Sequence, residues 1–269
     1  MPAGEMGMRP MLTISDARKT FHPGTPDERR ALAGVDLTLN EGDFCIVIGS
    51  NGAGKSTLLN AVAGKQRLDW GKVIIDGIDV TDFAVHERAR FISRVFQDPM
   101  TGTAPSMTVA ENLLLAELRG KPARLLPGLT KERRHAYRGR LQGLGLEIED
   151  RLDAPVGLLS GGQRQSLALL MAVSTSPRLL LLDEHTAALD PRTADAVMRM
   201  TVEAIARHRL TVLMVTHNMS HAVAYGDRLI MMDEGRIHLE IGGAEKKRVT
   251  IESLISRFHV KTDRIVLQA

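Results

Sequence analysis

The chain has 269 residues, enough for one large domain or for a domain that carries an inserted lobe. Hydrophobic residues make up 43% of it, an ordinary share for a globular protein with a substantial core, which excludes disordered, collagen-like and disulfide-stapled classes. The formal net charge is only +3, and no basic stripe with interleaved aromatic residues accompanies it, so nucleic acid is not expected as a partner.

Cysteine usage and hydropathy limit where the chain works. Cys45 is the one cysteine and lies in an apolar run, so a disulfide within the chain is impossible and a reducing cytoplasm fits. The longest purely aliphatic run, residues 179–182, is far shorter than a membrane span, and the N-terminus has no apolar signal region. We expect any work at a membrane to need a separate membrane-spanning partner.

Short alternating apolar patterns at residues 12–14 and 35–39 predict strands of an antiparallel sheet, and residues 73–80 continue this pattern. Gly24 and Pro26 break the chain between the first two, as a loop should.

Three further segments are continuously apolar, short and followed at once by polar residues, which is typical of strands buried on both faces of a parallel sheet. They are residues 44–48, 179–182 and 211–215, with residues 229–232 as a candidate fourth. Helical patterns alternate with them, so the predicted core is α/β.

A glycine-rich segment, residues 49–57, follows the first buried strand directly and opens a helix. Its glycines let successive backbone N–H groups point inward around phosphate oxygens, and the helix adds its positive N-terminal end. We expect Lys55 to reach the β- and γ-phosphates and Ser56 to bind magnesium. A turn without function is the alternative, but the order of strand, motif and helix favours a phosphate loop (P-loop). Its predicted ATP-binding residues are Gly49, Ser50, Asn51, Gly52, Ala53, Gly54, Lys55, Ser56 and Thr57.

The strand signal disappears between residues 98 and 168, which we interpret as a helical lobe inserted into the α/β core. Thr108 and Glu111 have the spacing of a capping box, and residues 133–143 predict a basic helix with one solvated face. Near the C-terminus, Thr250 is predicted to cap another helix. The apolar side of that helix is expected to comprise Ile251, Leu254, Ile255 and Phe258.

A second candidate anion site lies at residues 159–163, Leu-Ser-Gly-Gly-Gln, ahead of an apolar helix. Ser160 and Gln163 have capping-box spacing, and Gly161 and Gly162 expose backbone N–H groups. A generic helix cap would explain the serine and the glutamine, but not all five residues in a chain that also has a P-loop.

A carboxylate pair ends the buried strand at residues 179–182. The strand places Asp183 beside the P-loop, where it can hold magnesium through water, and Glu184 is one residue further on, where it can polarise an attacking water. Alone, Asp-Glu after a strand would be an ordinary acidic turn; paired with a P-loop, it predicts an active site.

With these motifs together, the chain resembles the ABC (ATP-binding cassette) ATPases over nearly its whole length, and residues 159–163 match the family signature. The resemblance implies an α/β fold with a P-loop NTPase core of mixed or parallel sheet, an N-terminal antiparallel β subdomain and an inserted helical subdomain. The expected division is one domain at residues 1–269. Within it, a nucleotide-binding core comprises residues 11–97 plus 169–269, and the signature-bearing helical subdomain comprises residues 98–168. The implied activity is ATP hydrolysis, with ATP and Mg²⁺.

The resemblance assigns roles to three residues that would be weak candidates alone. Phe21 matches an aromatic residue that stacks on adenine, although His22 is a neighbouring candidate and a phenylalanine near a strand end is usually core. Gln97 matches a glutamine that touches magnesium and water and links to the membrane partner; the alternative is an ordinary loop residue. His217 matches a histidine that contacts the γ-phosphate; the alternative is a structural histidine.

Two residues after the carboxylate pair complete the match. Asp190 belongs to a loop that crosses to the other subunit in the family, and it also precedes Pro191 as a helix N-cap would, so we expect both roles. His185 departs from the family, in which many members have proline after the catalytic glutamate. A histidine in place of this proline removes no group that hydrolysis needs.

The family mechanism implies two subunits paired head to tail, expected here to be identical copies. The γ-phosphate would meet Lys55, Ser56, Gln97 and His217 of one chain and Ser160 and Gly162 of the other. Glu184 would position or deprotonate the water for in-line attack, with Asp190, Gly161 and Gln163 completing the interface around ATP.

One uninterrupted cassette without a fused membrane region favours transport through a separate ABC permease, from the cytoplasmic face of the cell membrane. The P-loop form and the length are similar to importer subunits that work with an extracytoplasmic solute-binding protein. The run of residues 216–219 through 225–228 resembles one importer branch, and that resemblance implies an amino-acid-like solute as the expected cargo. Met100 and Met107 either contact the permease or lie in the core. The alternatives are a stand-alone ATPase in iron–sulfur cluster assembly or cell division, and the ATPase of an exporter.

Overall fold

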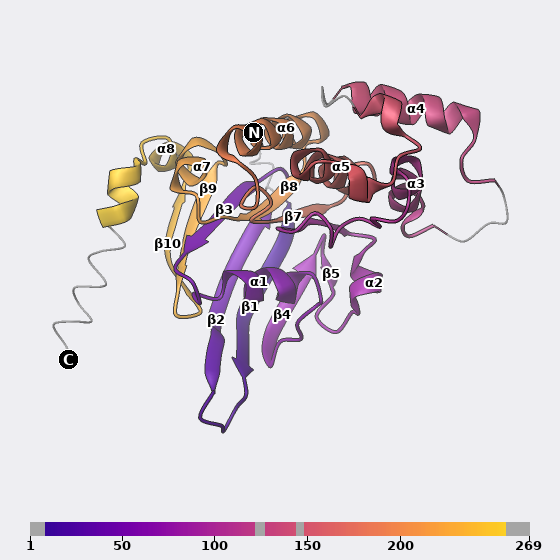
Figure 1. Cartoon of the computed structure of the whole chain (residues 1–269). Helices are drawn as coiled ribbons and strands as arrows, with labels where there is room; N and C mark the ends of the chain where they lie inside the picture. Colours follow the sequence, from indigo (N-terminus) through magenta and orange to yellow (C-terminus); the bar gives the residue numbers. More distant parts are fainter. Residues whose placement is uncertain (1–8, 122–126, 144–147, 257–269) are drawn as a thin grey trace, which may run out of the picture.

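The computed structural model describes residues 9–121, 127–143 and 148–256, which form two β-sheets with helices on both faces of the larger one (Figure 1). The smaller sheet is antiparallel and has the strand order β2-β1-β4-β5. Its strands are β1 (Pro10–Phe21), β2 (Arg29–Asn40), β4 (Trp70–Ile75) and β5 (Ile78–Asp79). β1 and β2 extend the predicted strands well beyond their apolar centres, and the turn that contains Gly24 and Pro26 joins them.

The prediction of one continuous strand at residues 73–80 is wrong. Asp76 and Gly77 both have left-handed backbone angles, with φ of 52° and 78°. Ile75 pairs with Ile78 across them, so the segment folds back as a hairpin with a two-residue turn. Positive φ at both central residues matches the strand twist in such turns, and an Asp-Gly pair adopts it readily.

The larger sheet has six strands in the order β10-β9-β3-β8-β7-β6, of which only β10 runs antiparallel to its neighbour. Its strands are β3 (Phe44–Gly49), β6 (Ile92–Val95), β7 (Leu179–Asp183), β8 (Thr211–Val215), β9 (Arg228–Asp233) and β10 (Arg236–Gly242). All four predicted buried strands are confirmed. β6 and β10 were not predicted, because β6 includes Ser93 and Arg94 and β10 alternates with exposed residues.

Consecutive side chains of the central strands enter different hydrophobic cores. In β7, Leu179 and Leu181 join the cluster that contains α1 and the smaller sheet, whereas Leu180 and Leu182 join the cluster that contains α5 and α6. Both faces of the larger sheet are therefore buried from water at these strands, which explains the unbroken apolar runs in the sequence.

This two-sided burial predicts a large cost for truncating a central strand residue. We expect Leu181→Ala to lower the free energy of unfolding by about 2–5 kcal/mol, because Leu181 is fully buried and the surrounding layers cannot collapse into the cavity. Chemical denaturation measures the loss. Leu158→Ala is the control, since Leu158 is 68% exposed and its truncation should stay within about 0.5 kcal/mol of the parent. Equal losses in the two variants would contradict the proposed core.

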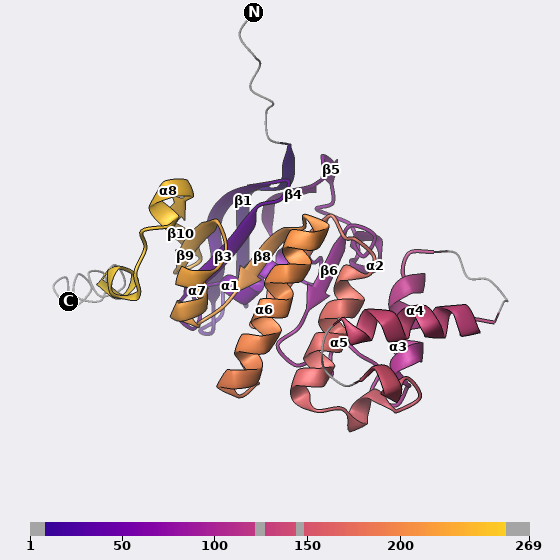
Figure 2. The same cartoon turned by 90° about the horizontal axis from the view of Figure 1, so that it is seen from above.

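The longer helices cover the larger sheet and build a lobe beside it (Figure 2). α5 and α6 pack on one face, and α3 and α4 form a third hydrophobic cluster with Leu167, Leu170 and Met171 of α5. The helices are α1 (Lys55–Val62), α2 (Val85–Arg88), α3 (Val109–Leu118), α4 (Lys131–Gln142), α5 (Gly161–Val173), α6 (Pro191–His208), α7 (Met219–Ala224) and α8 (Gly243–Lys246).

Helix caps in the lobe follow the sequence closely. The Thr108 hydroxyl accepts a hydrogen bond from the Glu111 N–H, and the Glu111 carboxylate accepts one from the Thr108 N–H, which confirms the capping box. α4 begins two residues earlier than predicted, at Lys131, behind an N-cap at Thr130. The boundary that we propose at residue 168 falls inside α5.

The last described helical turn covers residues 251–256. The Thr250 hydroxyl accepts a hydrogen bond from the Ser253 N–H at 3.2 Å, which confirms the cap. Leu254 is buried, but Ile255 is exposed, so its predicted place on the apolar side is wrong. Phe258 lies outside the described residues.

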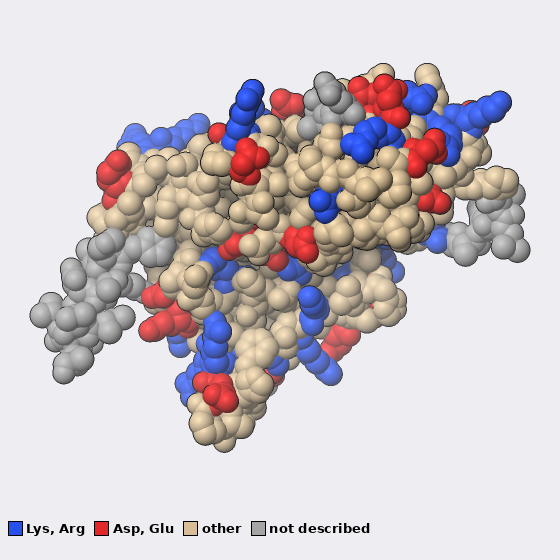
Figure 3. All heavy atoms as spheres, in the orientation of Figure 1, with Lys and Arg blue, Asp and Glu red and all other residues tan. Residues whose placement is uncertain are grey.

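Helix hydropathy and surface charge bear on whether the described part of the chain could sit in a membrane or bind a charged partner. Among the helices of the described ranges, none is both long and apolar enough to span a bilayer. On the face drawn in Figure 3, Lys and Arg side chains are interspersed with Asp and Glu.

Candidate nucleotide-binding and catalytic site

The P-loop connects the end of β3 to the start of α1, and two of its glycines are required by close packing. A Cβ atom at Gly49 would lie 2.2 Å from the Met232 carbonyl oxygen, and one at Gly54 would lie 2.3 Å from the Ala31 carbonyl oxygen. Gly54 also has φ of 102°, a left-handed value that favours glycine. The loop is thus wedged between β2 and the β9–β10 turn, which fixes its curled backbone.

Lys55 folds back into the curl of the P-loop. Its ammonium donates hydrogen bonds to the carbonyl oxygens of Gly49 at 2.7 Å and Ser50 at 2.9 Å, and the residue is buried. Burial lowers the pKa of Lys55 from its ordinary value, and the Glu184 carboxylate opposes that shift. A cation is therefore held inside the P-loop, with Glu184 within its electrostatic range.

Arg29 contacts the P-loop from β2, and the sequence did not predict this contact. Its guanidinium Nη2 donates to the Gly52 carbonyl oxygen at 3.0 Å, and Arg29 is paired across the hairpin with Phe21. Only the tertiary structure reveals this contact, because two strands, β2 and β3, and the turn between them separate Arg29 from Gly52 in the sequence.

Asp183, predicted as a magnesium ligand, is engaged in an ion pair. The Arg94 guanidinium Nη2 lies 2.5 Å from Asp183 Oδ2, while its Nη1 donates to Asn60 Oδ1 at 2.7 Å. The Arg94 guanidinium also lies 4.9 Å from the centroid of the Phe96 ring. Arg94, which is itself anchored by Asn60 of α1, thus holds the carboxylate at the end of β7. A charged residue inside the short strand β6 is the sequence signal that could have identified Arg94.

Glu184 and His217 meet at the ends of adjacent strands. The Glu184 Oε2 and His217 Nδ1 atoms are 3.1 Å apart, and the side chains are 18% and 60% exposed, respectively. An ionised carboxylate can only accept, so the Nδ1–H of His217 is the donor. Glu184 itself has φ of 45°, a left-handed value that is unusual for a residue with a side chain. The two predicted catalytic residues are therefore in contact, although 33 residues separate them.

Two pockets adjoin these groups. One, of about 210 Å³, is lined by residues around Glu184, His217 and the following loop, including His221 and Asp195. The other, of about 520 Å³, is lined by Arg29, the P-loop residues 50–53, Asp233 and Glu234. None of residues 160–163 lines either pocket.

The signature segment starts α5 in the predicted way. The Ser160 hydroxyl accepts from the Gln163 N–H at 3.2 Å, and the Ser160 N–H donates to Gln163 Oε1 at 3.1 Å, a complete capping box. A Cβ atom at Gly162 would lie 2.3 Å from the Thr193 side chain, so the signature packs closely on the start of α6.

Asp190 and Gln97 occupy loops at the carboxyl ends of strands. The Asp190 carboxylate accepts from the Thr193 N–H at 3.1 Å and caps α6, as predicted; its crossing to another subunit stays a prediction. Gln97 follows β6 and is exposed. Buried Gln165 of α5 donates to the Phe96 carbonyl oxygen at 3.1 Å, an anchor for this segment that was not predicted.

Phe21 and His22 lie at the tip of the β1–β2 hairpin. Phe21 is the half-buried last residue of β1, and the Lys19 ammonium lies 5.8 Å from its ring centroid. His22 is exposed in the turn, with φ of 50°. Both stay candidates for the adenine contact. Met100 is 37% exposed, so a place in the core is excluded for it, whereas Met107 is half-buried.

His185 follows Glu184 directly and is buried. Its Nε2 atom is 3.1 Å from Thr201 Oγ1 in the middle of α6. Burial, with a smaller contribution from His221, lowers the pKa of His185 to about 4, so its ring is neutral near pH 7.

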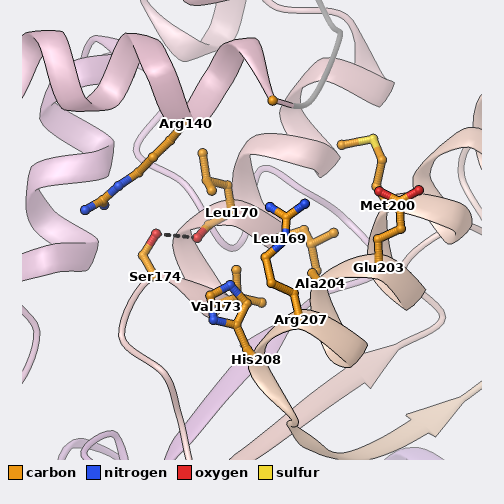
Figure 4. Close-up of a pocket in the computed structure, with 11 residues that line it drawn as sticks. Arg140, Leu169, Leu170, Val173, Ser174, Met200, Glu203, Ala204, Arg207 and His208 are labelled. Atoms are coloured by element: carbon orange, nitrogen blue, oxygen red, sulfur yellow. Dashed lines mark hydrogen bonds between the residues drawn. The ribbon is translucent and has the colours of Figure 1, made fainter.

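A further pocket of about 330 Å³ lies between the ends of α4, α5 and α6 (Figure 4). Leu169, Leu170 and Val173 line it, and the Ser174 hydroxyl at its edge donates to the Leu170 carbonyl oxygen at 2.6 Å. It contains none of the predicted site residues.

Comparison with known proteins agrees with this geometry. Residues 32–187 match the family model described as "ABC transporter". The chain is 43% identical over 251 residues to a tyrosine transport ATP-binding protein of Clostridioides difficile, covering 92% of this chain and 98% of that protein. It is 34% identical to the glutamine transport ATP-binding protein GlnQ of Geobacillus stearothermophilus, covering 77% and 82%.

A solved structure shares both the fold and a similar level of identity. It is a dimeric post-hydrolysis state of the ATP-binding cassette MJ0796 bound to ADP and Pi, with a TM-score of 0.73 and 30% identity, covering 86% of this chain and 98% of that one. With the P-loop, the carboxylate pair and the signature in place, the chain belongs to the ABC transporter ATP-binding family and is an ATPase of that family.

Proposed function

We propose that this chain powers the import of a small amino-acid-like solute through a separate membrane permease. The observation that carries the proposal is the 43% identity, over almost the whole of both chains, to a tyrosine transport ATP-binding protein. The similarity to GlnQ, named for glutamine transport, points to the same solute class. We place two copies at the cytoplasmic face of the membrane, with an extracytoplasmic solute-binding protein as a further partner.

The chemistry of the predicted metal ligands Asp183, Ser56 and Gln97 fits Mg²⁺. Magnesium prefers oxygen ligands and is usually bound by one or two carboxylates together with substrate phosphates. Asp183 supplies a carboxylate, Ser56 an exposed hydroxyl and Gln97 an exposed amide oxygen. Within the described ranges no cluster of three or more His, Cys, Asp or Glu side chains could hold a metal, which agrees with a site completed by ATP. When bound, Mg²⁺ would neutralise charge on the phosphates.

The P-loop and Lys55 would bind the phosphates. The loop N–H groups and the α1 N-terminus supply donors, and the Lys55 ammonium would exchange its two carbonyl acceptors for phosphate oxygens. Because Lys55 is buried, each such contact is stronger than in water. Stacking on the adenine is assigned to Phe21, at the tip of the hairpin.

Glu184 would act on the attacking water. Its carboxylate accepts a hydrogen bond from His217 Nδ1 and keeps a second oxygen for a water proton. The water would be oriented in line with the γ-phosphate, and the proton would move to the carboxylate or be shared with it as the bond forms. His217 fixes the carboxylate and is 60% exposed, in reach of the γ-phosphate in our proposal.

A second copy would complete the site. The signature start offers the N–H groups of an exposed helix end, yet it lines neither pocket beside the P-loop of its own chain. In the proposed pair, Ser160, Gly161, Gly162 and Gln163 of one copy close on the nucleotide of the other, and Asp190 lies at the contact between the two. The dimeric cassette among the solved structures supports this arrangement.

The test is recovery of the transporter from native membranes. Tagged Glu184→Gln protein is incubated with ATP and detergent-solubilised membranes, and co-purifying proteins are identified by mass spectrometry. We expect a polytopic permease encoded with a solute-binding protein, and uptake of a labelled aromatic amino acid that depends on this chain. The matched control is Lys55→Met, which should recover less permease when ATP is required for the stable complex.

Either alternative function would give a different result. A reproducible soluble partner without a permease would favour cluster assembly or cell division. A permease without any solute-binding protein, and cargo movement outward in vesicles, would identify an exporter.

A further inference from the structure

A buried hydrogen-bonded tie links the residue after Glu184 to the middle of α6. His185 is 2% exposed and Thr201 is fully buried. The Thr201 hydroxyl donates its one proton to the Val197 carbonyl oxygen at 2.8 Å. The His185 Nε2 atom, 3.1 Å from that hydroxyl oxygen, must therefore be the donor in their contact.

The tie is adjacent to a backbone conformation that needs support. Glu184 has φ of 45°, a left-handed value that is unfavourable for a residue with a Cβ and persists only when its surroundings fix it. The Glu184 N–H donates to the Val215 carbonyl oxygen at 3.0 Å, and its carbonyl oxygen accepts from the Ala187 N–H at 2.9 Å. These bonds set the turn on the strand side. The next residue, His185, contacts Thr201 of α6.

The same contact joins the two ends of the segment that runs from His185 to Thr201 in the middle of α6. Residues 186–190 leave the catalytic turn, and α6 returns past His185 at Thr201. Within this closed segment, Leu189 and Thr193 contact the signature, because Cβ atoms at Gly161 and Gly162 would lie 3.4 Å and 2.3 Å from their side chains. The tie therefore connects the turn at Glu184 to the loop that packs on the signature of the same chain.

We propose that His185 and Thr201 are positioning residues for hydrolysis, which act by holding the left-handed turn that presents Glu184 to His217. The inference rests on the proposed role of Glu184. If the pair only stabilised the fold, breaking it would lower the free energy of unfolding and leave kcat unchanged. If the pair positions Glu184, breaking it lowers kcat.

Thr201→Val tests the tie, because valine keeps the shape of threonine and removes the acceptor. We expect kcat to fall about tenfold or more, as for a small misplacement of a catalytic group, while KM and the Kd for ATP change less than about twofold. Thr201→Ser, which restores the hydroxyl, should return kcat to within about twofold of the parent. His185→Asn is too short to reach Thr201 and should reproduce the loss if Thr201→Val does not fold.

A double variant and a matched control distinguish a positioning role from an effect on stability alone. The His185→Asn/Thr201→Val double variant should lose no more kcat than the worse single variant, since both break one contact. Ser166→Ala removes a buried hydroxyl on neighbouring α5 that donates to the Met200 sulfur at 3.8 Å, and it should leave kcat unchanged. Thermal midpoints are measured for every variant.

Three results would overturn the proposal: full kcat in Thr201→Val, failure of Thr201→Ser to restore it, or a kcat loss that Ser166→Ala shares at equal thermal midpoint. Glu184→Gln is assayed in parallel. If it turns over ATP normally, the role of Glu184 itself is wrong; if it is inactive while Thr201→Val is unaffected, only the tie is rejected.

Discussion

Glu184→Gln should reduce ATP turnover by about 10²–10⁴-fold, the range attributed to a positioned general base. Glutamine keeps the shape of the side chain and a contact with His217, but it cannot take a proton from water. Because the substitution leaves the P-loop intact, the Kd for ATP should change less than about threefold. Phosphate release measures turnover, and a fluorescent ATP analogue measures binding.

The same variant should accumulate as an ATP-bound dimer, seen by size-exclusion chromatography with light scattering. Glu203→Gln is the matched control, because Glu203 is an exposed carboxylate of α6 away from the P-loop. It should hydrolyse ATP like the parent and stay monomeric after turnover. Undiminished hydrolysis in Glu184→Gln would remove Glu184 from the mechanism.

Lys55→Met should weaken ATP binding by about 10–100-fold, the loss of one or two charge-assisted hydrogen bonds to phosphate. Methionine retains the apolar stem that packs in the loop, so the change isolates the ammonium. The two carbonyl groups that Lys55 now satisfies, those of Gly49 and Ser50, would also lose their donor. Equilibrium binding of ATP and ADP measures the effect.

The control for this prediction lies just beyond the same helix. Lys65→Met removes an exposed ammonium close in sequence and should leave the Kd within about twofold of the parent. If both lysines contributed equally, binding would depend on the general positive charge of this region and not on the P-loop.

The sequence was most informative where chemistry demands a fixed local pattern. The unbroken apolar runs predicted the central strands, since a strand buried on both faces has no polar side. Capping boxes at Thr108 and Ser160 were predictable because both partners lie within one helical turn. The short hairpin at Asp76 was missed, although Asp-Gly is its usual signal, because the flanking apolar pattern continued across it.

Contacts between distant segments could not be predicted in this way. Arg94 meets Asp183 across 89 residues, and Arg29 reaches the P-loop although β2, β3 and the turn between them separate the two in the sequence. His185 shows the difference most clearly. Its residue type was visible in the sequence as a departure, but the contact that explains it depends on where α6 returns, which no local pattern encodes.

The Arg94–Asp183 ion pair changes what capture of a divalent cation would require. A free aspartate at a surface samples several rotamers and loses that freedom when it coordinates a metal. Here the carboxylate is already held between Arg94 and the end of β7, so the ordering cost is met during folding. The entropic penalty of metal ligation would therefore be smaller, but the cation would have to displace the Arg94 guanidinium from the Asp183 carboxylate. Such a site would favour a doubly charged cation over a monovalent one, because the cation has to outweigh the attraction of a guanidinium for the same carboxylate.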